Sequence, residues 1–335
     1  MNYTGFPVHD SIVSGQALTE RVLSKYDLPS PISCHYYTLG HNDTYVVRAG
    51  KSTYYLRVYR YGWRTKKEIQ AELDMLIYLH QRRLPTSYPL KRKDGSYLNR
   101  ISVSEGVRYA ALFSNAPGTP VGMDGSYCRT YGELVGRVHA CLDKAPDDDR
   151  RFHLDFSHLI DEALYYTKPL MEHRKEDFDY LTNVGRELWE RIEDLLPKTK
   201  PEYGSCHGDH HGGNLHVDEK GQMTLYDFDC YGYGYRAYDI AVFLWNRALN
   251  FGVRGIGKAK VTRRWNAFLK GYAKTRTVSD RELDATRVFV PIRHIWMVGS
   301  HTQKAETFGH SWMNDGYFNN HIDFIKRWIE SNKIL

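Results

Sequence analysis

The sequence lacks the features that would place the protein in a membrane or outside the cell. No stretch approaches eighteen uninterrupted apolar residues, the length of a membrane-spanning helix. The first twenty residues have no basic start followed by an apolar run, so no secretory signal is visible. The five cysteines form no Cys-x-x-Cys pair, and their odd number does not suit a disulfide framework. We therefore expect a cytoplasmic protein with reduced thiols and no membrane partner.

The charge distribution and the absence of certain motifs argue against a nucleic-acid-binding protein, an H-E-x-x-H zinc enzyme and a repeat protein. The net charge is +6, but no cluster of lysine and arginine is interleaved with aromatic residues, so no nucleic-acid partner is expected. The chain has no G-x-G-x-x-G loop and no H-E-x-x-H zinc motif. Internal repeats and low-complexity segments are also absent. No heptad pattern indicates an oligomeric state, so both a monomer and a dimer remain open.

Apolar periodicity separates a β-rich first third from a helical remainder. The first part predicts a sheet with one packed helix, from a helix at 15–26, strands at 32–39, 43–49, 53–60, 96–103 and 107–113, and a helix at 65–82. The rest predicts helices at 127–142, 158–170, 175–196, 236–250, 259–275, 280–300 and 313–332. Ser279 and Glu282 have the spacing of a capping box. We expect an α+β protein with a β-rich lobe (1–114), a hinge (115–125) and a helical lobe (126–335).

The stretch 207–229 interrupts the helical part with closely spaced polar groups. We expect a loop at 207–214, a strand at 215–217, a turn containing Gly221 and a second strand at 223–228. A tight hairpin brings its ends together, so we expect Asn214 and Asp227 to lie side by side. Asp209 projects from the same loop. Two carboxylates and one amide would then converge.

Phosphoryl transfer is the chemistry that this Asp-Asn-Asp pattern suits. The reaction needs a carboxylate beside the acceptor hydroxyl to take its proton. It also needs hard oxygen ligands for magnesium, which takes only one or two carboxylates from a protein. The protein-kinase pattern H-R-D-x-x-x-x-N followed by D-F-G has its counterpart here in His207-Gly208-Asp209, Asn214 and Asp227-Phe228-Asp229.

HGDxHxxN followed by a strand that ends in DFD resembles the aminoglycoside phosphotransferase and choline kinase family, a branch of the protein-kinase-like fold. Within it, the chain is similar to the group that contains stress-response kinase A and type II homoserine kinases. The likeness spans roughly 30–300 and includes the LRVYR strand, a Trp-containing turn and AALFSNAPGTPV. It implies a two-lobed kinase fold, ATP as donor, Mg²⁺ as cofactor and a hydroxyl acceptor. It does not imply which acceptor.

The resemblance assigns roles to the motif residues. Asp209 is the expected catalytic base, and Asn214 and Asp227 are the expected magnesium ligands. Asp229 either reaches a second metal or caps the following turn. His207 corresponds to a kinase histidine that is usually structural. Asp239, where the next helix opens, is expected to accept backbone N–H groups of the catalytic loop and hold the loop rigid.

The strand at 53–60 should carry the group that contacts the ATP phosphates. Most kinases have lysine there, but the matching residue is Arg57, which grips phosphate through two points. Glu72 is its expected partner on the following helix, with Glu68 second. Four more residues complete the expected nucleotide site, two in the loop over the phosphates and two in a segment whose backbone meets adenine: His41, Asn42, Phe113 and Ser114.

The histidines allow a different interpretation, a zinc hydrolase that uses His207, His210, His211 and His216. No thiolate pair joins them, and zinc would leave the Asp-Asn-Asp spacing unexplained. We expect His210 instead in a solvent-facing slot or in the acceptor pocket. The aromatic residues of the C-terminal half could form a cage for a cationic acceptor, although helix packing explains most of them.

Three functions remain open. The favoured one is an ATP- and Mg²⁺-dependent kinase of a small hydroxylated metabolite, amino alcohol or antibiotic. The second is a Ser/Thr protein kinase resembling stress-response kinase A. The third is a nucleotide-binding protein without turnover. The chain runs from Asp229 to Asp239 within ten residues, too few for the long activation segment of a protein kinase, which favours a small acceptor. The intact motif argues against the third function, because mere binding needs no base.

Overall fold

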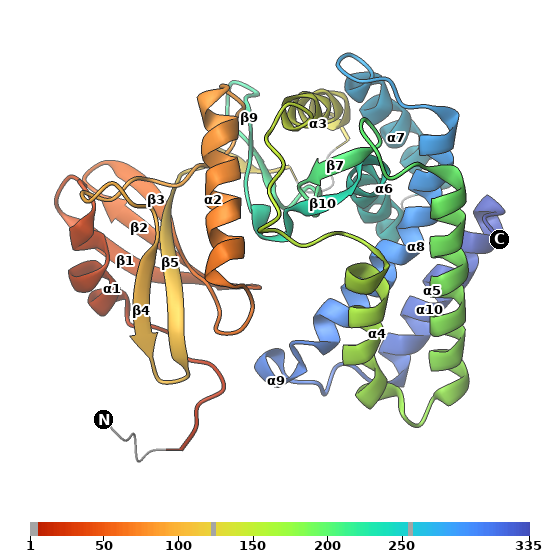
Figure 1. Ribbon diagram of the computed structural model, residues 1–335, viewed down its shortest axis with the longest axis horizontal. Coiled ribbons are helices and arrows are strands. Elements are labelled where there is room, and N and C mark those ends of the chain that lie inside the picture. Colours follow the sequence, from red (N-terminus) through yellow and green to blue (C-terminus); the bar gives the residue numbers. More distant parts are fainter. Residues whose placement is uncertain (1–5, 122–124, 254–256) are drawn as a thin grey trace. The chain divides into compact units, whose positions relative to one another are not determined.

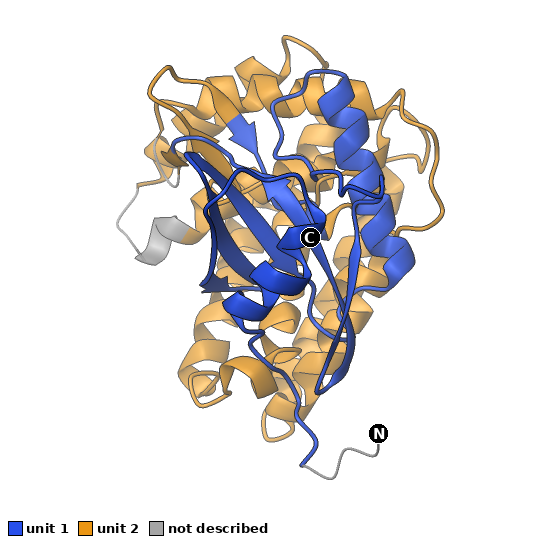
Figure 2. Cartoon of the chain, turned by 90° about the vertical axis from the view of Figure 1, so that its left-hand side faces the viewer, with its two compact units in different colours: residues 1–118, 224–229 blue, residues 119–223, 230–335 orange. Residues whose placement is uncertain are grey.

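The computed structural model describes residues 6–121, 125–253 and 257–335, which divide into two compact units (Figure 2). Unit 1 comprises Met1–Gly118 and Thr224–Asp229, and unit 2 comprises Thr119–Met223 and Cys230–Leu335. The segment 224–229, expected in the helical lobe, belongs to unit 1. The reason is local, because Leu225 exchanges backbone hydrogen bonds with Pro85 and Ser87.

Unit 1 is built on a five-stranded antiparallel sheet with the order β1-β2-β3-β5-β4 (Figure 1). Its strands are β1 (Ile32–Leu39), β2 (Asp43–Ala49), β3 (Ser52–Val58), β4 (Asn99–Val103) and β5 (Gly106–Ser114). Short turns join the first three strands, as alternating apolar runs separated by GHN and GKS predict. The predicted antiparallel sheet is therefore confirmed.

Two helices cover the two faces of this sheet (Figure 1). The helix α1 (Gly15–Arg21) and the 3₁₀ turn η1 (Leu23–Lys25) pack on the face that includes Leu56 and Val58. Arg57 points to the opposite face, because side chains alternate along a strand. There it meets α2 (Lys66–Gln81), which begins at a capping box formed by Thr65 and Glu68.

Unit 2 is mainly helical, with a few short strands. Its helices and helical turns are α3 (Cys128–Leu142), η2 (Ser157–Asp161), α4 (Glu162–Thr167), η3 (Lys168–Met171), α5 (Lys175–Leu195), α6 (Arg236–Val253), α7 (Lys258–Tyr272), α8 (Asp280–Thr302), α9 (Ala305–Phe308) and α10 (Asp315–Asn332). Its strands are β6 (Thr119–Pro120), which pairs with β8 (Leu215–Val217), and β7 (Tyr203–Cys206), which pairs with β10 (Gly232–Tyr235). The chain re-enters unit 1 within β9 (Met223–Leu225) and leaves it within η4 (Phe228–Cys230).

The helix α8 is the central element of unit 2 and contacts α4, α5, α6 and α10. The predicted capping box of Ser279 and Glu282 is confirmed at its start. Pro291 lies inside α8 and has no N–H for the carbonyl of Arg287, four residues earlier. The indole Nε1 of Trp328 on α10 donates to that carbonyl at 2.9 Å. A backbone acceptor that the helix cannot satisfy therefore fastens α10 to α8.

No helix in the described part of the chain combines the length and apolar character needed to cross a bilayer. All five cysteines are free thiols.

Candidate active site

Asp239, in the first turn of α6, anchors the loop that begins at His207. Its carboxylate accepts the backbone N–H groups of His207 at 2.8 Å and Gly208 at 2.7 Å, and it lies 2.8 Å from Nε2 of His139. Burial alone would raise the pKa of Asp239, but His210 and His139 hold that pKa well below its usual value. Gly208 has a φ of +81°, and a Cβ there would lie 2.1 Å from the carbonyl oxygen of Cys230. The loop therefore requires glycine at this position.

Both carboxylate oxygens of Asp209 have partners in unit 2. Oδ1 accepts a hydrogen bond of 2.5 Å from Nη2 of Arg293, on α8. Oδ2 accepts one of 3.1 Å from Nδ2 of Asn214 and lies 3.3 Å from Nε2 of His211. Burial would raise the pKa of Asp209, but the charges of His211 and Arg293 and the hydrogen bond from His211 hold it well below its usual range. Asp209 is thus an ionised carboxylate with a fixed orientation.

Asn214 has a chemistry that fits a magnesium ligand. Its Nδ2 donates to the backbone carbonyl of Asp209 and to the Asp209 carboxylate, both at 3.1 Å. The amide therefore donates its N–H groups to the loop that begins at His207, and its carbonyl oxygen is the atom that can bind a hard cation.

The histidines of the loop lie in different environments. Nδ1 of His207 accepts the backbone N–H of Asp209 at 3.2 Å, which suits a structural role. His210 is completely buried, with its Nε2 3.3 Å from the Asp239 carboxylate, so the expectation of a solvent-facing slot is wrong. His139, His210 and Asp239 offer atoms within 4.8 Å of one another. Hydrogen bonds to Tyr272 and to the loop backbone already use His139 and Asp239, so this trio forms a scaffold network and does not match the proposed zinc set.

Arg57 joins two carboxylates in unit 1. Its Nη1 donates to Glu72 at 2.7 Å, the partner that the sequence suggested, and its Nη2 donates to Asp227 at 2.8 Å. Burial would lower the pKa of Arg57, but Asp227 and Glu72 raise it well above its usual value. The two carboxylates differ, since the Glu72 side chain is fully buried and the Asp227 side chain is 45% exposed. Asp227 can therefore bind a ligand while Glu72 keeps the arginine paired.

The backbone at Asp227 departs from the predicted strand. β9 ends at Leu225, and Asp227 has a φ of +62°, in the left-handed region. Non-glycine residues reach this region at a cost, and such strain concentrates at functional sites.

Asp229 is buried and held by the turn between β3 and α2. Nε1 of Trp63 donates to its Oδ2 at 2.6 Å, and Nη2 of Arg64 donates to its backbone carbonyl at 3.2 Å. The Trp63 ring stacks on His41, with 4.7 Å between the ring centroids. These contacts fit a structural carboxylate better than a ligand of a second metal, and they place His41 beside an aromatic ring.

The remaining candidates for the nucleotide site already use several of their polar groups within unit 1. Asn42 is buried and accepts the backbone N–H of Arg60 through Oδ1 at 3.1 Å. The N–H of Ser114 donates to the carbonyl of Tyr88, and its carbonyl accepts the hydroxyl of Ser87. The Phe113 ring lies 5.2 Å from the guanidinium of Arg57. The Ser114 N–H is therefore already used, whereas its carbonyl oxygen can accept a second hydrogen bond.

Two contributors to the site were missed in the sequence, Trp63 and Arg293. Arg293 interrupts the apolar run VFVPIRHIWMV, and a lone charge inside such a run was the available signal. Its guanidinium lies 4.9 Å from the ring centroid of Trp245 and 4.2 Å from that of Trp296. Two tryptophans that could have formed a cage for a cationic acceptor are therefore engaged with a cation of the protein itself.

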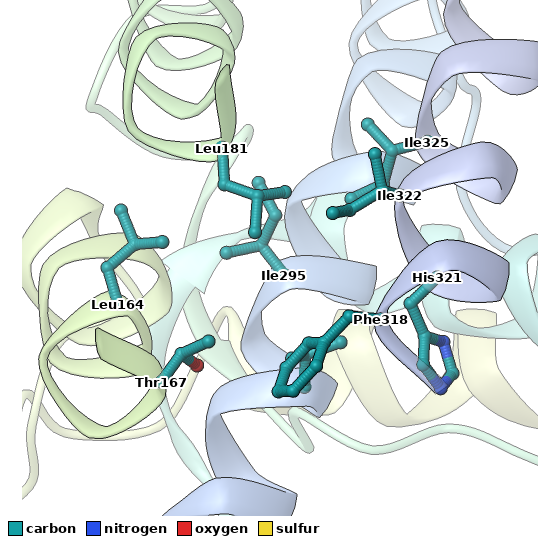
Figure 3. Close-up of a pocket in the computed structure, with 9 residues that line it drawn as sticks. Leu164, Thr167, Leu181, Ile295, Phe318, His321, Ile322 and Ile325 are labelled. Atoms are coloured by element: carbon teal, nitrogen blue, oxygen red, sulfur yellow. The ribbon is translucent and has the colours of Figure 1, made fainter. Parts of the chain in front are cut away.

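Unit 2 contains a small cavity (Figure 3). Side chains from α4, α5, α8 and α10 line it, and most are apolar, among them Leu164, Leu181, Ile295, Phe318 and Ile322. None of the candidate site residues lines it.

Comparisons with known proteins identify the family and the fold. Residues 40–277 match the phosphotransferase enzyme family. An uncharacterized protein of Deinococcus radiodurans is 33% identical over 327 residues, which cover 97% of this chain and 93% of that protein. The chain shares its fold with an amicoumacin kinase solved with AMP-PNP, Ca²⁺ and Ami (TM-score 0.78, 22% identity, 94% of each chain covered). It also shares its fold with a microcompartment-associated aminopropanol kinase (TM-score 0.78, 18% identity, 96% of this chain and 99% of the other).

Proposed function

Since the chain belongs to the phosphotransferase enzyme family, we propose that it transfers the γ-phosphate of ATP, with Mg²⁺, to a hydroxyl group of a small molecule in the cytoplasm. The observation that carries the proposal is the link between Asn214 and Asp209. One loop presents a carboxylate for the acceptor proton and an amide oxygen for the cation. The AMP-PNP and Ca²⁺ in the amicoumacin kinase structure support a nucleotide and a divalent cation.

Each group has one task in the proposed reaction. Asp209 accepts the proton of the acceptor hydroxyl, and the acceptor oxygen bonds to the γ-phosphorus as the bond to the β–γ bridging oxygen breaks and ADP leaves. Asn214 and Asp227 would hold Mg²⁺, which supplies positive charge for the phosphates. Arg57 contacts phosphate oxygens with its guanidinium. His207 and Asp239 keep the loop in place.

A small acceptor is favoured over a protein substrate by the segment that follows the DFD motif. After Asp229 the chain passes directly into β10, which pairs with β7, and α6 begins at Arg236. Few residues remain for an activation segment that could dock a peptide. Two of the similar structures carry the names of kinases that act on amicoumacin and aminopropanol, which also supports a small acceptor.

The experiment is a screen for ATP consumption over amino alcohols, sugars, aminoglycosides and peptides, with Asp209→Asn as the blank. We expect stimulation of ADP release by at least one small hydroxylated compound, with wild-type protein only. Stimulation by peptides alone would favour the protein-kinase function. Tight Mg-ATP binding without transfer to any compound would favour a nucleotide-binding protein.

A further inference from the structure

The residues that precede α1, 10–13, lie on unit 1 as an N-terminal strap that polar contacts hold in place. The hydroxyl of Ser11 lies 2.7 and 3.0 Å from the two carboxylate oxygens of Glu105. The carbonyl of Ser11 accepts a hydrogen bond of 2.8 Å from Nη1 of Arg108. The carbonyl two residues further on accepts the hydroxyl of Tyr45 at 2.6 Å. The strap is therefore bonded to unit 1 through its backbone and its side chains.

Asp10 connects this strap to two buried arginines. Its carboxylate forms an ion pair with Nη1 of Arg60 and lies 3.7 Å from Nη1 of Arg108. Asp43 is a second carboxylate for the same two groups. Its Oδ1 lies 3.4 Å from Nη2 of Arg60, and its Oδ2 accepts a hydrogen bond of 2.5 Å from Nη2 of Arg108. Because buried charges are costly unless they are paired, the two aspartates fix the two guanidinium groups.

The turn that begins at Arg60 holds the loop between β1 and β2, residues 39–42, which is expected to lie over the phosphates. The backbone N–H of Arg60 donates to Oδ1 of Asn42 at 3.1 Å. The ring of His41 stacks on that of Trp63, and the backbone N–H of Trp63 donates to the carbonyl of Arg60 at 3.3 Å. Two successive residues of the loop are therefore bonded to or stacked on this turn.

We propose that Asp10 is a positioning residue for nucleotide binding, and that through Arg60 it fixes the loop at 39–42 in the conformation that receives the phosphates of ATP. This inference rests on the proposed function. Asp10 acts through Arg60, which holds Asn42, and does not contact the nucleotide. Because the loop meets the phosphates and not the base, loss of Asp10 weakens the binding of a nucleoside triphosphate more than the binding of adenosine.

The first test compares two ligands in one variant. Asp10→Asn keeps the size of the side chain and removes its charge. Calorimetry measures the affinity for Mg-AMP-PNP, and competition measures the affinity for adenosine. We expect the affinity for Mg-AMP-PNP to fall roughly 3- to 10-fold and the affinity for adenosine to stay unchanged. Asp10→Glu, which restores the charge, should recover part of the loss.

The matched control is Ser14→Ala, at the residue that follows the strap. The hydroxyl of Ser14 caps α1 by accepting the N–H of Ala17 at 3.4 Å, so its loss should lower the melting temperature and leave the ratio of the two affinities unchanged. No change in Asp10→Asn, or an equal loss for both ligands, overturns the inference. If Asp10→Asn does not fold, Ser11→Ala loosens the same strap and should change the ratio in the same direction, and an unchanged ratio there overturns the inference equally.

The second test needs no nucleotide. Hydrogen exchange at the Arg60 amide, followed by NMR, reports on the bond from that amide to Asn42. We expect exchange to be roughly 3- to 10-fold faster in Asp10→Asn and unchanged in Ser14→Ala. Equal exchange in Asp10→Asn and wild type overturns the inference. Wild-type protein that binds neither AMP-PNP nor adenosine overturns the proposed function and, with it, the role in nucleotide binding, whereas the exchange rate still shows whether Asp10 holds the loop.

Discussion

Arg57 in unit 1 and Arg293 in unit 2 each hold one of the aspartates to which we assign a task in the proposed reaction, but their surroundings differ. Arg57 lies between Asp227 and the buried Glu72. Arg293 pairs with Asp209 alone among the carboxylates of the described residues, and aromatic rings flank it. Glu72 therefore still neutralises the charge of Arg57 when Asp227 binds a ligand instead. Arg293 would lose this carboxylate partner if Asp209 moved.

This difference assigns different tasks to the two aspartates. The Asp227 side chain is 45% exposed, and its partner Arg57 is also paired with Glu72. Asp227 can therefore leave Arg57 to bind a metal ion, which suits a metal ligand. Asp209 is 16% exposed and held at both oxygens, which suits a base that must keep one orientation through the reaction. The four predictions below test this division and the contacts that support each unit, from the largest expected effect to the smallest.

Asp209→Asn should lower phosphoryl transfer by on the order of 10² to 10⁴ and leave Mg-ATP affinity nearly unchanged, because an amide cannot accept the proton. ADP release in the presence of the acceptor measures the first quantity and calorimetry the second. The control is Asp323→Asn, which changes an exposed aspartate on α10. Normal turnover in Asp209→Asn would show that Asp209 is not the catalytic base.

Arg57→Met should destabilise the protein by roughly 3 to 5 kcal/mol, because it leaves the buried Glu72 carboxylate without its cation. Urea unfolding measures the loss. Arg57→Lys keeps the charge and should recover most of the stability while binding ATP less tightly, since lysine lacks the planar fork. Equal stability of the methionine variant and wild type would show that Glu72 does not depend on Arg57.

Acidification should destabilise unit 2 before ordinary carboxylates titrate. Burial lowers the pKa of His139 to about 3, whereas an unfolded histidine titrates near 6.5. Between these values the unfolded chain binds the extra proton, so stability falls as pH drops from about 6.5, by up to several kcal/mol. Asp239, with a lowered pKa, loses its own contribution only at still lower pH. Urea unfolding at pH 7.5 and pH 5 measures the change, and a flat profile would contradict it.

Trp63→Phe should cost about 1 to 3 kcal/mol of stability, because it removes the indole donor from the buried Asp229 carboxylate. Mg-ATP affinity should change little if Asp229 is structural. Asp229→Asn serves as the matched variant, since it keeps the size and removes the charge. A large loss of magnesium-dependent binding in Asp229→Asn with normal stability would instead make Asp229 a metal ligand.

The family, the fold and the enzyme class could be predicted because they depend on local patterns. Strand alternation and turn residues predicted the sheet of unit 1, and Ser279 with Glu282 predicted the start of α8. The spacing of Asp209, Asn214 and Asp227 led to the phosphotransferase family, which the match over residues 40–277 confirms. The narrower likeness to stress-response kinase A and homoserine kinases stays a prediction, as do the roles of the individual residues.

What escaped prediction depends on contacts between distant segments. Arg293 meets Asp209 across 84 residues, and Trp63 meets Asp229 across 166. The strands β7 and β10 are four residues each and contain glycine, so no alternating apolar pattern marked them. His210 looked like a loop residue open to solvent, but packing beside His139 and Asp239 buries it.

The most direct measurement is the calorimetric affinity for AMP-PNP, with and without Mg²⁺, of three proteins: wild type, Asp209→Asn and Asp227→Ala. The account predicts that Asp209→Asn binds like wild type, whereas Asp227→Ala loses the part of the affinity that depends on magnesium. Equal binding by both variants, or a loss confined to Asp209→Asn, would contradict the division of tasks between the two aspartates.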